Sequence, residues 1–202
     1  MTTTARPGPD GRLRCPWALE PAEYLAYHDN EWGRPIHDDV GLYERLTLEA
    51  FQSGLSWLTI LRKRQNFQHA FAGFDPEVVA RFSGPDVDRL LTDPGIVRNR
   101  AKIVAAVTNA RAVLFLRKRD GDGAFSRLVW SHQPDPGPAP TSLADVPAST
   151  PESVALARDL KRHGFVFVGP TTAYATMQAA GLVDDHLADC FARRTRHAAT
   201  LQ

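Results

Sequence analysis

The stretch from Arg100 to Gly121, RAKIVAAVTNARAVLFLRKRDG, decides the fold class of this chain. Its apolar residues recur at the steps of three and four that keep side chains on one helix face, at Ile103, Val107, Ala110 and Leu114. Gly121 stands where a helix ends, because glycine adopts the conformation of a C-terminal stop without a steric penalty. The stretch therefore predicts a helix to about Asp120, the longest of the molecule.

The same helical spacing recurs on both sides of this stretch. It predicts further helices at residues 38–53, 57–71, 171–180 and 185–193. Strand patterns are nearly absent, since only Phe165 to Val168 fits extended chain, and this segment is too short to build a sheet. The sequence therefore predicts an all-α protein.

Capping residues predict two more helices. Asp75 precedes a proline and an acid, the usual start of a helix, and we expect Gly84 to end the turn that follows. Ser149 and Glu152 form a capping-box pattern, which predicts a helix after them. The proline-rich residues 133–151 are expected to be an irregular connection, because proline lacks an N–H donor and disfavours helix before it.

Length and composition fit one domain. The chain has 202 residues, 43% of them hydrophobic, which is enough for a core shared by two helical lobes. We expect residues 1–13 to be a disordered tail, residues 14–194 to form the domain and residues 195–202 to be a flexible tail. The sequence has neither the apolar run of a secretory signal nor a membrane-spanning stretch, which predicts a soluble intracellular protein.

The net charge of +1 does not exclude a nucleic-acid partner, because such an enzyme needs a positive face rather than a positive total. Basic residues cluster at positions 62–64, 98–102, 117–119 and 161–162. For each cluster, a solvated helix face and a set of phosphate contacts are equally good interpretations.

Cysteine and histidine stand at both ends of the chain. Cys15 and His28 lie in the N-terminal segment, and His186 and Cys190 lie near the other end, four residues apart. On a helix this spacing places both side chains on one face. In an intracellular protein a disulfide is the less expected use of two cysteines. Two cysteines and two histidines complete the ligand set of a structural Zn²⁺. From spacing alone, unrelated buried side chains are the better-supported alternative, because the pairs are far apart in sequence.

Aromatic residues gather around His28, at Trp17, Tyr24, Tyr27 and Trp32. They fit a stacking surface and an ordinary aromatic core equally well. Glu49 is an acid within an otherwise apolar helix, and a buried carboxylate needs a partner or a task. If Glu49 shares a pocket with the rings, the pocket would suit a flat cation such as an alkylated purine. An ion pair between Glu49 and an arginine is the alternative.

The stretch from Asp93 to Ile103, DPGIVRNRAKI, places a glycine turn before a basic helix. Backbone amides at such a turn and at a helix N-terminus can hold a phosphate. The expected DNA contacts are Gly95, Arg98, Arg100 and Lys102. The stretch resembles the helix-hairpin-helix element of DNA repair enzymes, and a plain connection between two helices is the alternative.

Several strings together resemble the bacterial DNA-3-methyladenine glycosylase I family, from about Arg14 to Arg193. The matching strings are Arg14-Cys15 to Trp17, Tyr27 to Gly33, Leu48-Glu49, Gly54 to Trp57, Asp93 to Lys102, Gly164-Phe165, Phe167 to Gly169, and Met177-Gln178 to His186. Their number and order are specific, unlike any one of them. The resemblance implies a helix-hairpin-helix DNA glycosylase fold.

The resemblance also implies an activity. It is that of a monofunctional glycosylase that hydrolyses the N-glycosidic bond of 3-methyladenine in double-stranded alkylated DNA, the first step of base excision repair. Such an enzyme flips the damaged base out of the duplex. Strand cleavage is not expected, because the matching pocket strings hold no lysine to act as an amine nucleophile. A monomer in the bacterial cytoplasm, at the nucleoid, is expected.

The resemblance assigns roles to the residues already singled out. It implies that Cys15, His28, His186 and Cys190 bind one structural Zn²⁺, which joins the N- and C-terminal segments. Glu49 is implied as the catalytic carboxylate, Tyr27 as a hydrogen-bonding partner and Trp57 as a stacking wall. Further substrate-binding rings are implied at Trp17, Tyr24 and Trp32.

Three other classes of protein fit the sequence less well. A non-catalytic zinc module that binds DNA leaves the acid and the rings unexplained. A zinc-dependent hydrolase needs an open coordination position, and four protein ligands leave none. An iron–sulfur glycosylase needs four thiolates, and the chain has two cysteines.

Overall fold

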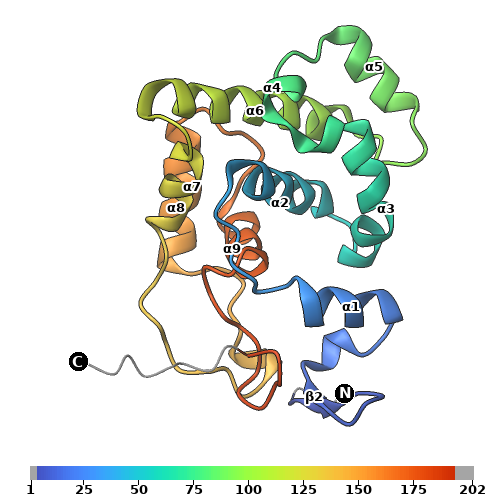
Figure 1. The fold of residues 1–202 in the computed structure, drawn as a ribbon, viewed down its shortest axis with the longest axis vertical. Coiled ribbons are helices and arrows are strands. Elements are labelled where there is room, and N and C mark those ends of the chain that lie inside the picture. Colours follow the sequence, from blue (N-terminus) through green and yellow to red (C-terminus); the bar gives the residue numbers. More distant parts are fainter. Residues whose placement is uncertain (1–3, 194–202) are drawn as a thin grey trace.

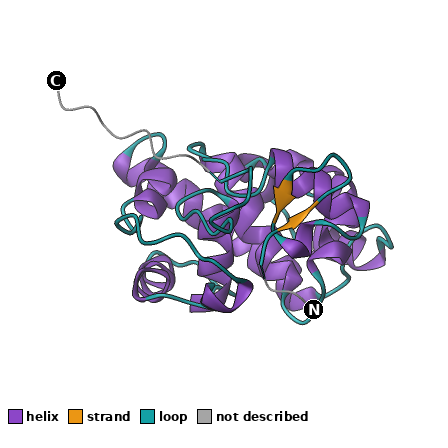
Figure 2. Cartoon of the chain, turned by 90° about the horizontal axis from the view of Figure 1, so that it is seen from below, coloured by secondary structure: helices purple, strands orange, loops and turns teal. Residues whose placement is uncertain are grey.

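Nine α-helices account for almost all regular structure in residues 4–193, the part of the chain that the computed structural model describes (Figure 2). In chain order they are α1 (Ala22–Asn30), α2 (Asp39–Gln52), α3 (Trp57–Ala70), α4 (Pro76–Val79), α5 (Gly84–Thr92), α6 (Arg100–Asp120), α7 (Ala124–Trp130), α8 (Pro151–Arg162) and α9 (Pro170–Ala179). Short 3-10 turns lie at Pro16–Ala18, Ala72–Phe74 and Leu143–Asp145. The predicted helical class is confirmed.

Helix α2 lies at the centre of the molecule and packs against α3, α6, α7 and α9 (Figure 1). Asp38 caps its N-terminus by accepting a hydrogen bond from the Gly41 amide at 2.7 Å. Large side chains on several of its faces are fully buried, among them Leu42 and Phe51. Each such burial stabilises the fold by about 1.5–3 kcal/mol. Two charged residues of the same helix, Arg45 and Glu49, are buried with them.

Helix α6 confirms the bounds predicted from its periodicity. Asn99 caps its start by accepting from the Lys102 amide at 3.1 Å, and Gly121 ends it with a φ of 83°. Ile103 and Ala110 on its inner face are fully buried. None of the helices in the described chain has the length and apolar character needed to cross a membrane.

Three helices were not predicted, and one expected turn is part of a helix. Gly84 begins α5 rather than ending a turn, because Ser83 and Asp86 form a capping box around the helix start. The other two missed helices are α1 and α7. Helix α8 is capped by Thr150, one residue after the predicted cap.

The helix predicted for residues 185–193 is absent, and the segment consists of turns. Its backbone forms isolated turns, such as the bond from the Cys190 amide to the Leu187 carbonyl, and two of its amides donate to other segments. The Ala188 amide donates to the Pro140 carbonyl at 2.8 Å, and the Phe191 amide donates to the Leu13 carbonyl at 2.9 Å. Tertiary contacts therefore override the local helical pattern.

A disordered tail is predicted over residues 1–13, and the structure describes this segment from residue 4. Strands β1 (Arg6–Pro7) and β2 (Leu13–Arg14) pair antiparallel. This hairpin lies beside the C-terminal turns at the lower end of Figure 1. A small second core forms there around Cys15, Leu187 and Cys190. The expected tail at residues 195–202 lies outside the described residues.

Candidate active site and metal-ligand cluster

A cavity of about 340 Å³ opens beside the C-terminal half of α2. Its lining residues are Trp17, Tyr27, Trp32, Glu49, Gln52, Trp57, Leu143, Val146, Ala175, Gln178 and Asp185. Five of the six residues predicted to bind or act on a substrate lie in this set, and Tyr24 does not. The Pro16–Ala18 turn, α1 with the residues that follow it, α2 and the start of α3 therefore bring the predicted rings and the predicted acid into one cavity.

Glu49 is 7% exposed, and its carboxyl group forms no hydrogen bond with any described residue. Burial raises the pKa of its carboxyl group to about 8, against a smaller opposing effect of the nearby Arg45 guanidinium. An ion pair is therefore not what keeps Glu49 inside the protein, and its carboxyl group remains available to a molecule in the cavity.

Aromatic rings form the walls around Glu49. The ring centroids of Tyr27 and Trp57 lie 5.3 Å apart, with a tilt of 47° between the rings. The Trp57 indole N–H is buried and has no hydrogen-bond acceptor among the described residues. The Arg45 guanidinium lies 5.6 Å from the centre of the Tyr27 ring and holds its outer face. The cavity thus combines flat apolar walls with the carboxyl group of Glu49.

Tyr24 supports the cavity from outside. Its hydroxyl oxygen accepts a hydrogen bond from the Leu58 amide at 2.9 Å, which ties α1 to the first turn of α3. Its ring meets Trp17 edge to face, with centroids 5.9 Å apart. Tyr24 therefore positions a lining ring and the start of α3 rather than lining the cavity itself.

Sequence reasoning missed three polar lining residues, Gln52, Gln178 and Asp185. Gln52 stands three residues after Glu49 on α2, so helical spacing alone would have placed it on the same face. The other two lie within a string that resembles the family, but nothing in their spacing pointed to the cavity.

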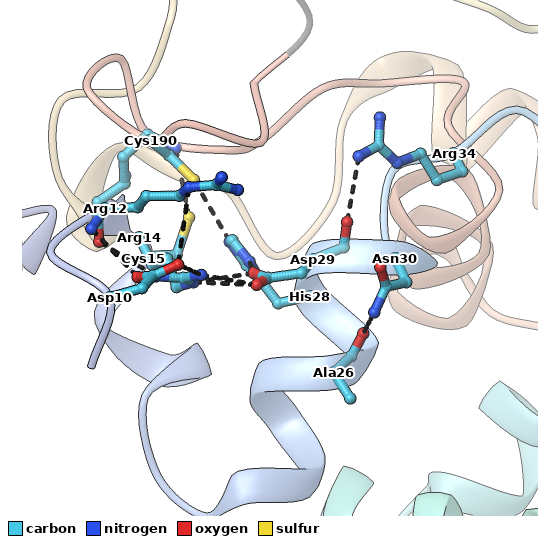
Figure 3. Close-up of polar contacts among 11 residues, drawn as sticks. Asp10, Arg12, Arg14, Cys15, Ala26, His28, Asp29, Asn30, Arg34 and Cys190 are labelled. Atoms are coloured by element: carbon cyan, nitrogen blue, oxygen red, sulfur yellow. Dashed lines mark hydrogen bonds and ion pairs between the residues drawn. The ribbon is translucent and has the colours of Figure 1, made fainter. Parts of the chain in front are cut away.

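The predicted metal ligands from both ends of the chain meet next to this cavity. The ligand atoms of Cys15, His28 and Cys190 all lie within 4.8 Å of one another, and His28 Nε2 is 3.4 Å from Cys190 Sγ (Figure 3). The ring of His186 lies 4.9 Å from that of His28, measured between centroids. The cluster therefore joins three predicted ligands closely, with the fourth beside them.

His186 Nε2 is buried and has no hydrogen-bond partner within residues 4–193. A buried ring nitrogen without a partner is costly, and a metal ion on that side would satisfy it. Gly33 makes room for the ring, because a Cβ at this position would lie 2.8 Å from His186 Cε1. The donor set of two sulfurs and two imidazoles fits Zn²⁺.

Carboxylates orient both imidazoles. His28 Nδ1 lies 2.8 Å from Asp29, and His186 Nδ1 lies 2.8 Å from Asp184. Asp29 is held in turn by the buried Arg14 guanidinium (Figure 3). With Nδ1–H donated to a carboxylate, each ring keeps its Nε2 lone pair for another partner, as metal-bound histidines do.

The two thiols also affect one another. The Cys15 thiol donates toward Cys190, which raises the pKa of Cys15 and lowers the pKa of Cys190 to about 4. The lowered pKa of Cys190 favours its thiolate, the form that binds metal ions.

The ligand cluster and the cavity share a wall. Trp17 lies 5.3 Å from His28, and Trp32 lies 4.6 Å from His186, measured between ring centroids. The two tryptophans are 5.0 Å apart and both line the cavity. Contacts that hold the two histidine rings in place therefore also hold the two tryptophans in one wall of the cavity.

The predicted DNA-binding element comprises the connection between α5 and α6 and the first turn of α6, and two of its four predicted residues are already engaged. The Gly95 amide donates to Asp93 at 2.7 Å. Lys102 is only 7% exposed, and its ammonium group donates to the carbonyls of Phe51 and Ser53 at 2.8 and 2.6 Å. The structure therefore does not place Lys102 where a phosphate would reach it. Its charge is used at the C-terminal end of α2.

The other two predicted residues face solvent. Arg98 and Arg100 are both exposed. Arg100 donates to Asp88 of α5 at 2.7 Å, a surface ion pair of small stabilising value. Both guanidinium groups therefore lie where they can meet an anion.

Comparison with known proteins gives a consistent result. Residues 17–193 match the sequence model of a family described as methyladenine glycosylase. A DNA-3-methyladenine glycosylase 1 from Escherichia coli K12 is 47% identical over 180 residues, which cover 88% of this chain and 95% of the relative.

Two solved structures are similar over most of the chain. A crystal structure of 3-methyladenine DNA glycosylase I superposes with a TM-score of 0.85 at 46% identity and covers 90% of this chain and 100% of its own. A 3-methyladenine DNA glycosylase I from Staphylococcus aureus, described for its recognition of 3-methyladenine, has a TM-score of 0.85 at 38% identity and covers 90% and 97%.

Proposed function

The chain belongs to the methyladenine glycosylase family, and from this premise we propose that it excises 3-methyladenine from alkylated DNA as a monofunctional N-glycosylase. One observation carries the proposal for this chain: Glu49 is buried without a hydrogen-bond partner among the described residues, in a cavity walled by Trp17, Tyr27 and Trp57. A flat cationic base is the ligand that such a cavity suits, through stacking and a negative countercharge.

The charge on the damaged base supplies much of the driving force. Methylation at N3 makes adenine cationic, which weakens the glycosidic bond, so the leaving base needs no general acid. A cation in the cavity lowers the pKa of the Glu49 carboxyl group and favours its ionised form. The resulting ion pair stabilises the base, and Glu49 is also placed to orient water or to stabilise the oxocarbenium-like sugar as the bond breaks.

A base in duplex DNA can reach this pocket only by flipping out of the helix. We propose that the 3-methyladenine nucleotide leaves the duplex and enters the cavity, where stacking on the rings offsets the loss of stacking in DNA. The exposed Arg98 and Arg100, beside the amides at the start of α6, are proposed to bind backbone phosphates. No lysine lines the cavity within the described chain, which favours hydrolysis without strand cleavage.

We further propose that Cys15, His28, His186 and Cys190 hold one Zn²⁺. The unpaired Nε2 of His186 and the carboxylates behind both imidazoles support this assignment. Four protein ligands leave no open position, so a bound Zn²⁺ would supply structural stability rather than Lewis-acid chemistry. A monomeric state and a location in the bacterial cytoplasm and nucleoid stay predictions.

Release of free base from DNA tests the proposal directly. The purified full chain is incubated with duplex DNA treated with a methylating agent, and released bases are separated by chromatography. We expect 3-methyladenine without strand breaks. Binding of DNA without any base release would instead favour a non-catalytic DNA-binding protein, and strand breaks would contradict the monofunctional assignment.

A further inference from the structure

Gln178 lines the cavity from the last turn of α9, and its amide group is held from behind. Its Nε2 donates to Asp185 Oδ2 at 2.8 Å. The Tyr174 hydroxyl, one helical turn earlier, donates to the same oxygen at 2.6 Å. Two donors from one helix therefore fix the position of the Asp185 carboxylate, which in turn fixes the Gln178 amide.

This contact determines which way the amide of Gln178 points. A carboxylate oxygen that already accepts a hydrogen bond from Tyr174 acts here as an acceptor, so the Gln178 atom that faces it must be the nitrogen. The flipped amide would place two oxygens 2.8 Å apart. The side-chain oxygen therefore points away from Asp185, and no described residue donates a hydrogen bond to it.

We propose that Gln178 is a specificity-determining residue, whose Oε1 accepts a hydrogen bond from the exocyclic amino group of an adenine-type base. This inference rests on the proposed glycosylase function. A guanine-type base carries a carbonyl oxygen at the corresponding position, and two opposed oxygens repel each other. Gln178 thus favours adenine derivatives by attraction and disfavours guanine derivatives by repulsion, while Glu49 provides the attraction to positive charge that both share.

The test compares two damaged bases in one DNA sample. Methylated duplex DNA contains 3-methyladenine and 3-methylguanine, and single-turnover release of each is measured with the wild type and with Gln178→Leu. We expect the variant to release 3-methyladenine about 10-fold more slowly, as loss of one buried hydrogen bond predicts. Release of 3-methylguanine should be unchanged or faster, so the ratio of the two rates falls.

Gln68→Leu is the matched control. The Gln68 amide also donates to a carboxylate, that of Glu44 at 3.0 Å, but it lies on α3 outside the cavity lining. This variant should keep the wild-type ratio. A second variant, Asp185→Asn, should lower the ratio less than Gln178→Leu, because an amide at 185 can partner either orientation of Gln178.

The outcomes separate this inference from the proposed function. A wild-type chain that releases neither base overturns the proposed function and this inference with it. An active wild type with an unchanged ratio in a folded Gln178→Leu variant overturns the inference alone, as does an equal loss for both bases. If Gln178→Leu does not fold, binding of free bases to the wild type decides. Tryptophan fluorescence should then show at least about 10-fold tighter binding of 3-methyladenine than of 3-methylhypoxanthine, which has a carbonyl in place of the amino group. Equal affinity overturns the inference.

Discussion

At the scale of single residues, Glu49 and Gln178 line the same cavity but differ in whether their side chains have a hydrogen-bond partner. Gln178 is oriented by a hydrogen bond to a neighbouring carboxylate, whereas Glu49 has no such bond within the described chain. An unpaired buried carboxyl group lowers stability, and the cost is recovered only when a ligand supplies the missing charge. The residue that is least satisfied in the empty cavity is therefore the one best placed to respond to a cation.

Replacing Glu49 with glutamine removes that charge with little change in shape. We expect Glu49→Gln to lower the single-turnover rate of 3-methyladenine release by about 100-fold or more, the usual scale for loss of a catalytic acid or base. The fold should be retained, as checked by circular dichroism and zinc content. A well-folded variant with near-normal release would remove Glu49 from the mechanism.

The same substitution has a consequence for stability that depends on pH. The folded protein raises the pKa of Glu49 to about 8 from an ordinary value of 4.5, so folding favours the protonated carboxyl group. The stabilising contribution of that proton is complete below pH 4.5 and is lost as pH rises through about 8. We expect urea unfolding to show that the free energy of unfolding of Glu49→Gln, relative to wild type, increases between pH 5 and pH 8. Parallel pH profiles would contradict the raised pKa.

At the scale of elements, the connection between α5 and α6 and the first turn of α6 together have two separate roles. Its exposed arginines face solvent, whereas Lys102 turns inward and stabilises the end of α2. A cation at a helix C-terminus interacts favourably with the unpaired carbonyls there. The basic residues at positions 98–102 form one cluster in the sequence. In the structure the arginines of this cluster lie at the surface and its lysine lies in the interior.

This division predicts different effects for two basic residues of the cluster. Lys102→Met should lower the free energy of unfolding by about 1–3 kcal/mol, because hydrogen bonds from a charged group are lost. It should leave the salt dependence of DNA binding unchanged. Arg98→Ala should weaken DNA binding and reduce the slope of log K against log salt by about 1, with stability unaffected. Equal salt slopes for wild type and Arg98→Ala would exclude a phosphate contact at Arg98.

At the scale of the whole molecule, the two ends of the chain form one structural unit beside the cavity. The N-terminal hairpin and α1 bring Cys15 and His28 to the turns that carry His186 and Cys190. Trp17 and Trp32 lie between these residues and the cavity. A metal ion in the cluster would therefore act on the pocket through its walls, without contact with the substrate.

Cys190→Ser tests this connection. We expect elemental analysis to show loss of bound zinc, together with a melting temperature lower by several degrees, because the closure of the two ends is weakened. Tryptophan fluorescence should shift toward that of exposed indoles as Trp17 and Trp32 loosen. Full zinc occupancy in this variant would rule out Cys190 as a ligand. As a control, Ser131→Ala at an exposed position should leave the zinc content, the melting temperature and the fluorescence unchanged.

The sequence by itself determined the helical class, the bounds of α6 and five of the eleven cavity-lining residues, because helical periodicity is a local property and the matching strings carry the rings and Glu49. The capping box of Ser83 and Asp86 is likewise a local feature of the sequence. The tertiary structure alone decided that residues 185–193 form turns, that Lys102 is buried and that Asp185 orients Gln178. These three features depend on hydrogen-bond partners distant in sequence or on turns that local propensity does not specify. Such hydrogen bonds form only when the helices pack.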